Sequence, residues 1–148
     1  MNTVDEILDF AIAREQEAAD FYHNLAARVD SAWMKEMLLG FKEEELRHKG
    51  KLKSVKKGEK LLSSQQQVQD LKISDYLIDV QPAEDISLQD AMIIAMKREK
   101  LAYRLYSDLA AKAEDPEMKE LFSGLAQEEA KHKLYFEVQY DEQVLRDN

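Results

Sequence analysis

Apolar residues recur along this chain at the three- and four-residue spacing of an α-helix, in four separate stretches. The first stretch carries Ile7, Leu8 and Ala11 and continues to Leu25 with the same period. Between the second and third stretches the pattern loosens for almost thirty residues, where a glutamine run interrupts it. The pattern predicts helices over residues 3–29, 31–57, 87–113 and 115–144.

Each predicted helix begins at a residue suited to cap it. Thr3 and Glu6 have the spacing of a capping box, in which each side chain bonds to the backbone of the other residue. Ser31 and Ser87 are hydroxyl caps, and Asp115 is followed by proline, which fits the first turn of a helix. These caps separate the helices within each pair by only a few residues, which predicts two antiparallel helical hairpins.

A long crossover joins the two predicted hairpins. The segment from Ile73 to Pro82 within it suggests a short helix and an extended piece. Few glycines and prolines, with abundant Ala, Leu, Glu, Lys and Gln, favour an all-α chain. At 148 residues we expect one domain. Its expected parts are hairpin 1 at about 3–57, the crossover at about 58–86 and hairpin 2 at about 87–145.

The second hairpin repeats the first. Residues 11–52 align with residues 95–136 without a gap, 84 positions later, and 16 of the 42 pairs are identical. Shared helical composition produces some matches, but not easily the Glu, Tyr, Gly and His matches in one register. An internal duplication is therefore the simpler interpretation.

A Glu-x-x-His pair occurs once in each hairpin, at Glu45 and His48 and again at Glu129 and His132. The surrounding sequences read G-F-K-E-E-E-L-R-H-K and G-L-A-Q-E-E-A-K-H-K. Residues three apart lie on one face of a helix, so each pair directs a carboxylate and an imidazole to one point. Four-helix bundles that hold two metals use two such pairs and one further Glu from each remaining helix.

Glu15 and Glu99 are suited to be those further glutamates. Glu15 lies fifteen residues before the turn near residue 30, and Glu45 lies fifteen residues after it. Glu99 and Glu129 flank the turn near residue 114 in the same way. At about 1.5 Å of rise per residue, the members of each pair stand at the same height.

Burying these six ionisable groups in a bundle core requires compensation. Two divalent cations would supply it, and four carboxylates with two imidazoles suit iron or manganese better than copper. Zinc would also bind, but carboxylate-rich sites with open positions suit redox chemistry with O₂ or peroxide.

Aromatic residues form a second group of candidates. Tyr22 and Tyr106 lie seven residues after Glu15 and Glu99, on the same helix faces. They are either ordinary core residues or groups that hydrogen-bond a ligand carboxylate and supply an electron. We expect Trp33 to be buried in the core.

Composition excludes several classes of protein. The chain has no cysteine, which excludes thiolate zinc sites, iron–sulfur clusters and a rubredoxin-type iron site within it. A net charge of −9 argues against nucleic acid as a partner. Without a membrane-spanning run or signal peptide, we expect a cytoplasmic protein with no membrane association. The basic run over residues 47–60 is either a solvated helix end or a docking patch for an acidic electron-donor protein.

Together these motifs resemble the rubrerythrin branch of the ferritin-like di-iron carboxylate proteins. The resemblance rests on A-I-A-R-E-Q-E-A-A-D-F-Y with E-E-E-L-R-H, and on A-M-K-R-E-K-L-A-Y-R-L-Y with E-E-A-K-H. It implies a ferritin-like four-helix bundle with a long crossover between its second and third helices, and often a homodimer. It also implies two iron ions, bridged by Glu45 and Glu129. The implied ligands are Glu15, Glu45, His48, Glu99, Glu129 and His132.

The resemblance implies an oxidoreductase that reduces hydrogen peroxide, or O₂, at an Fe(II)₂ centre. Two features depart from rubrerythrin: the chain stops without a rubredoxin domain, and Ala102 stands where the family has an additional glutamate. We therefore expect electrons from a separate donor protein. Two other functions stay open, a ferroxidase or iron-handling protein and a non-catalytic, metal-stabilised oligomerisation module.

Overall fold

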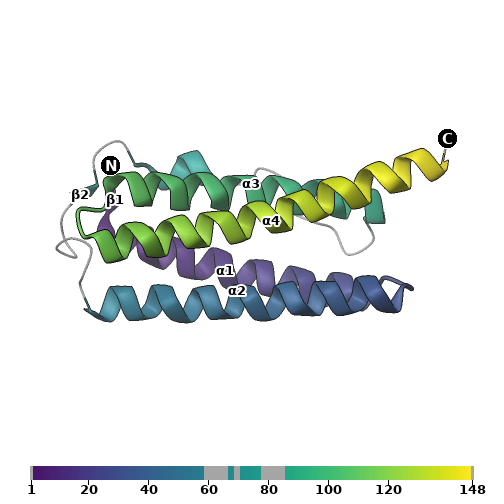
Figure 1. Ribbon diagram of the computed structural model, residues 1–148, viewed down its shortest axis with the longest axis horizontal. Helices are drawn as coiled ribbons and strands as arrows, with labels where there is room; N and C mark the ends of the chain where they lie inside the picture. The colour runs from purple at the N-terminus through teal and green to yellow at the C-terminus, as the bar shows by residue number, and fades with distance from the viewer. Residues whose placement is uncertain (1, 59–66, 69–70, 78–85, 148) are drawn as a thin grey trace. The chain divides into compact units, whose positions relative to one another are not determined.

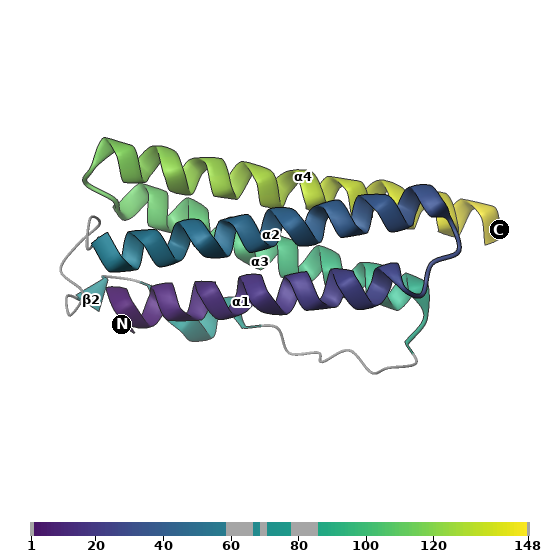
Figure 2. The same cartoon turned by 90° about the horizontal axis from the view of Figure 1, so that it is seen from below.

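The computed structural model describes residues 2–58, 67–68, 71–77 and 86–147. Four long helices dominate it (Figures 1 and 2). They are α1 (Val4–Ala26), α2 (Ala32–Gly58), α3 (Leu88–Lys112) and α4 (Pro116–Asp147). The short elements are β1 (Asn2–Thr3), β2 (Gln67–Val68) and the 3₁₀ helix η1 (Ile73–Tyr76).

The chain divides into two compact units, residues 1–73 and 74–148. In the first, α1 and α2 run side by side as an antiparallel hairpin, as both views show. β1 pairs antiparallel with β2 at the start of α1. Apolar residues line the inner faces of both helices. Among the most deeply buried are Ile7, Leu8, Ala11, Leu38 and Leu52.

The second unit is the hairpin of α3 and α4, with η1 beside α3. The hydroxyl of Tyr76 donates a hydrogen bond of 2.6 Å to the Asp108 carboxylate, which ties η1 to the helix. The guanidinium of Arg104 lies 5.9 Å from the centre of the Tyr76 ring. Deeply buried residues again line the inner faces. They include Met92, Leu109, Phe122, Leu125 and Phe136.

All four predicted helix starts are confirmed, and their caps follow the duplication. Thr3 and Glu6 form the full capping box of α1. Ser87, which corresponds to Thr3 in hairpin 2, accepts a hydrogen bond from a backbone N–H at the start of α3. Ser31 and Asp115 likewise accept backbone N–H bonds at the starts of α2 and α4. As a result, α3 and α4 each begin 84 residues after α1 and α2.

The structure corrects two of the expectations and bears out part of a third. α1 ends at Ala26 rather than near residue 29, because the backbone N–H of Arg28 bonds to the carbonyl of Leu25 and tightens the turn. Trp33 is 56% exposed, so its predicted burial was wrong; in the first turn of α2 it is the next residue, Met34, that is buried. The short helix predicted in the crossover is present as η1, whereas residues 59–66, 69–70 and 78–85 lie outside the described residues.

No described helix is sufficiently long and apolar to cross a membrane. The expectation that the two units form a single domain stays a prediction.

Candidate metal centre

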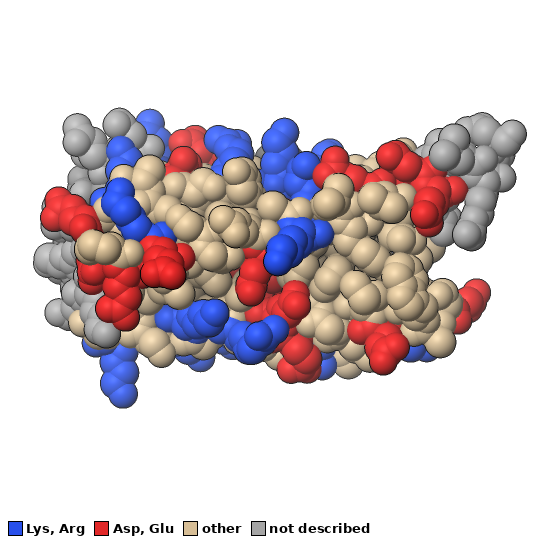
Figure 3. All heavy atoms as spheres, viewed as in Figure 1, with Lys and Arg blue, Asp and Glu red and all other residues tan. Residues whose placement is uncertain are grey.

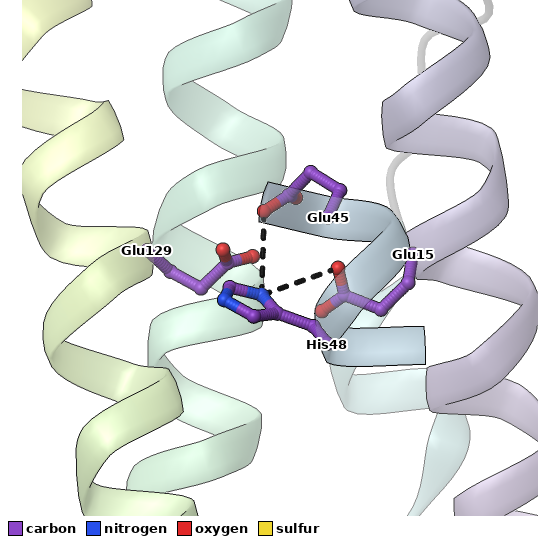
Figure 4. Close-up of side chains that lie close together, drawn as sticks. All are labelled: Glu15, Glu45, His48 and Glu129. Atoms are coloured by element: carbon purple, nitrogen blue, oxygen red, sulfur yellow. Dashed lines mark ion pairs between the residues drawn. The ribbon is translucent and has the colours of Figure 1, made fainter. Parts of the chain in front are cut away.

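A triad of buried polar side chains lies inside hairpin 1. Glu15 comes from α1, and Glu45 and His48 come from α2. The Nδ1 atom of His48 lies 3.5 Å from an oxygen of Glu15 and 3.4 Å from an oxygen of Glu45. Figure 4 shows this nitrogen facing both carboxylates. The three side chains are at most 2% exposed, so they are held away from water.

Hairpin 2 contains the corresponding triad in the same geometry. Glu99 comes from α3, and Glu129 and His132 come from α4. The Nδ1 atom of His132 lies 3.6 Å from a Glu99 oxygen and 3.7 Å from a Glu129 oxygen. These side chains are also at most 2% exposed. The duplication therefore extends from the sequence to the positions of the donor atoms.

The donor distances in both triads fit coordination of a cation. A good N–H···O hydrogen bond is about 2.9 Å long, which is shorter than all four Nδ1-to-oxygen distances. Two donors that each lie about 2.1 Å from one ion, at a tetrahedral angle, are about 3.4 Å apart. Within each triad, one donor atom per residue lies within 4.8 Å of the others.

The chemistry of the donors agrees with this geometry. Each triad gathers two carboxylates and one imidazole, and burying two like charges together is costly unless a cation compensates them. Oxygen donors with a single nitrogen suit hard or borderline ions such as iron and manganese, and the absence of sulfur argues against soft ions. The residues of each triad therefore fit a divalent metal ion, and the six predicted ligands are grouped three and three by hairpin.

The two predicted tyrosines lie in the cores of their hairpins. Tyr22 and Tyr106 are each 1% exposed. The Tyr22 ring meets that of Phe41 edge-on at 5.9 Å, whereas the Tyr106 ring stacks on that of Phe122 at 6.4 Å. These ring contacts give both tyrosines a packing role. A role in proton or electron delivery stays a prediction.

Sequence reasoning overlooked Tyr135. It lies one helical turn after His132 in α4, and its ring packs edge-on against that of Phe136 at 5.3 Å. Burial, assisted by the charge of Glu142, raises the pKa of the Tyr135 phenol, so it stays protonated and able to donate a hydrogen bond. Its counterpart in hairpin 1 is Lys51, so the repeat gave no signal for it.

Comparisons with known proteins support the fold. The family model described as Rubrerythrin matches residues 6–140. A hypothetical protein from Pyrococcus furiosus is 25% identical, with a TM-score of 0.72 over 93% of this chain and 87% of that one. A Thermotoga maritima protein described as a ferritin-like diiron-carboxylate protein is 20% identical, with a TM-score of 0.81 over 95% and 96% of the two chains. No curated protein matches the sequence. The predicted all-α, ferritin-like fold class is confirmed by the family match and by this structural similarity.

Proposed function

Because the chain belongs to the rubrerythrin family, we propose that it is a di-iron carboxylate oxidoreductase that reduces hydrogen peroxide, or O₂. In this reaction hydrogen peroxide takes up two electrons and two protons and yields two molecules of water. The observation that carries the proposal is the pair of matched, buried Glu-Glu-His triads.

We propose that the two triads together hold one pair of iron ions, three ligands from each hairpin. Family membership and the duplicated donor geometry support this pairing. When bound, the iron pair would supply the two electrons and the Lewis acidity that the reaction needs. Glu45 and Glu129 are the proposed bridging ligands.

The protein's own part is to prepare a dry and rigid donor set. His48 and Glu45 are one turn apart on α2, so the helix backbone fixes their spacing without help from flexible loops. Their burial excludes bulk water, which strengthens every electrostatic interaction at the site. Carboxylates that are held in this way can also accept and release the protons that the reaction consumes.

Electrons are proposed to come from a separate donor protein, because none of the 148 residues is a cysteine that could build a rubredoxin-type site. Tyr22 and Tyr106, buried in the two cores, are the proposed groups for assisting proton or electron delivery. Both proposals follow from the family's chemistry.

One observation favours ferroxidase or iron-handling activity as the alternative. The residue three positions after Glu99 is Ala102, where rubrerythrin has an additional glutamate that participates in metal movement. Without it, the chain has the symmetric set of six ligands. The missing glutamate weakens the support for the peroxidase and leaves the alternative open.

Stopped-flow oxidation of the anaerobically Fe(II)-loaded protein tests the proposal. Peroxide should oxidise the iron much faster than buffer does, and Glu45→Gln should slow this reaction by at least about a hundredfold. Glu43→Gln is the matched control, because Glu43 is exposed on the same helix. Oxidation by peroxide no faster than by buffer would exclude the peroxidase. Retention of more than two irons per chain after aerobic loading would favour the alternative.

A further inference from the structure

A ladder of lysines runs along one side of hairpin 1. Three lysines of α2 are spaced seven residues apart, and each contacts a side chain of α1 that belongs to a second series with the same spacing. Because the helices are antiparallel, the two series run in opposite directions. The pairs are Lys42 with His23 at 3.3 Å, Lys49 with Gln16 at 2.6 Å, and Lys56 with Asp9.

Beside the last pair of the ladder, near the end of α2, the surface has a hollow of about 540 Å³. Two further lysines at this end, Lys53 and Lys57, are exposed and lie one helical turn apart. The hollow is lined by Asp5, Asp9, Ile12, Lys53, Lys56 and Lys57. We call Lys49, Lys53, Lys56 and Lys57 the lysine face.

The charge of this segment differs from that of the rest of the chain. Residues 46–58 contain six lysines and arginines and no acidic residue, although the whole chain has a net charge of −9. Figure 3 shows blue side chains over this end of α2, at the lower left. The helix dipole accounts for basic residues in the last turn only, where Lys56 and Lys57 lie. The corresponding residues 130–142 of hairpin 2 contain two lysines and three acidic residues.

We propose that the lysine face is the docking surface for an acidic protein partner. Exposed charges at the edge of an interface mainly accelerate association with a partner of opposite charge. Asp5 and Asp9 in the hollow would repel a small anion, whereas a protein can place its acidic residues beside the lysines and avoid them. The chain's net negative charge likewise disfavours binding of nucleic acid at this surface.

The lysine face is also well positioned for electron delivery. Lys53 and Lys57 lie five and nine residues after His48 on the same helix, which places them about 7.5 and 13.5 Å along the axis from it. A partner docked there would approach the triad of hairpin 1 along α2. This role in electron delivery rests on the proposed function, whereas binding of the acidic partner does not.

Binding of a negatively charged rubredoxin tests the proposal, with positively charged cytochrome c as the comparison probe. Isothermal titration at low salt should show binding of rubredoxin that weakens as salt is added, and weaker binding of cytochrome c. Lys53→Glu with Lys57→Glu should weaken rubredoxin binding by about tenfold or more. Arg28→Glu with Lys35→Glu is the matched control, because both residues are exposed in hairpin 1 near the turn between α1 and α2, at the opposite end of α2 from Lys53 and Lys57.

At 0.1 M salt the control should bind rubredoxin within about twofold of the unchanged protein, because screening then confines surface charge effects to about 10 Å. Equal weakening in both double variants would overturn the proposal, since net charge alone would then explain it. Absence of rubredoxin binding at low salt would also overturn it. Lys53→Gln with Lys57→Gln, which removes charge without adding any, should give an intermediate loss and guards against misfolding of the glutamate variant.

Binding is measured without peroxide and without turnover, so its outcome is independent of the proposed oxidoreductase activity. If rubredoxin binds at the lysine face but peroxide does not oxidise the iron, the docking surface stands and the proposed function fails. If peroxide oxidises the iron but Lys53→Glu with Lys57→Glu binds rubredoxin normally, the proposed function stands and the docking surface fails.

Discussion

The two hairpins share their buried donors but differ along their surfaces. The Nδ1-to-oxygen distances are 3.4 and 3.5 Å in hairpin 1 and 3.6 and 3.7 Å in hairpin 2. By contrast, the lysine ladder has no equivalent in hairpin 2. Its counterpart positions are Ile93, Lys100, Ser107, Ala126, Lys133 and Tyr140. The geometry of the triad therefore does not depend on the contacts of the lysine ladder. That surface of hairpin 1 is available for another role, such as binding a partner.

The cores of the two hairpins place a phenylalanine and a leucine at exchanged positions. In hairpin 1 the buried pair is Leu38 and Phe41, and at the same positions of hairpin 2 it is Phe122 and Leu125. The ring that contacts the repeated tyrosine is thus displaced by about one helical turn. Total side-chain volume is the same in both arrangements, so each core can pack at normal density around the same triad.

The largest expected effect concerns the equivalence of the two triads. At a free concentration a thousandfold above its Kd, Mn²⁺ should stabilise the protein by about 4 kcal/mol. His48→Ala and His132→Ala should each lose a similar part of this stabilisation, because each removes one imidazole from a matched triad. Urea unfolding with and without Mn²⁺ measures it. His23→Ala, at an exposed histidine, is the control. A loss confined to one of the two variants would show that the triads are not equivalent.

An intermediate effect is expected from exchanging the core pattern. Leu38→Phe alone should cost about 1–3 kcal/mol by overpacking, and Phe41→Leu alone should cost about 1 kcal/mol by leaving a cavity. The double variant reproduces the pattern of hairpin 2 and should cost less than the sum of the two. A double-mutant cycle from chemical denaturation gives the coupling energy. Additive costs would mean that residues 38 and 41 do not compensate each other's volume in the core of hairpin 1.

The smallest effect concerns the caps of α1 and α3. Thr3→Ala and Ser87→Ala should each cost about 1 kcal/mol, since each removes the hydroxyl that accepts a backbone N–H. Only Thr3 belongs to a full capping box within the described residues, because the Glu6 carboxylate accepts a bond from its backbone N–H. Thermal unfolding of the two variants should therefore separate the caps by their pH dependence.

The sign of that dependence follows from Glu6. Its bond with the backbone of Thr3 lowers the pKa of the Glu6 carboxyl in the folded state. The resulting stability is present above the ordinary pKa of glutamate and is lost as the pH falls through the lowered value. The difference between the unchanged protein and Glu6→Gln should shrink over that window. A difference that stays constant would show that the charge of Glu6 does not act through the cap.

Much of this arrangement is predictable from the sequence because it is local and repeated. A cap specifies a helix start within one turn. The starts of all four helices were therefore predictable from their cap residues, Thr3, Ser31, Ser87 and Asp115. Ligands three apart on one helix lie together whatever the rest of the fold does. The distant glutamate of each triad was predictable because equal spacing from a turn fixes its height.

Features that depend on tertiary contacts could not be predicted from the sequence. β1 and β2 are two residues long, which is too short for a strand period to be recognised. The exposure of Trp33 depends on which side of the first turn of α2 is packed, which its apolar side chain does not reveal. The lysine ladder becomes visible only when the register of α1 against α2 is known.

The local origin of each triad has a consequence for synthesis of the protein. Glu15, Glu45 and His48 all lie within the first 48 residues, and the last donor of the other set follows 84 residues later. At about 5–20 residues per second, a ribosome makes those 84 residues in roughly 4–17 seconds. For that interval the nascent chain carries one finished set of three donors and lacks the other.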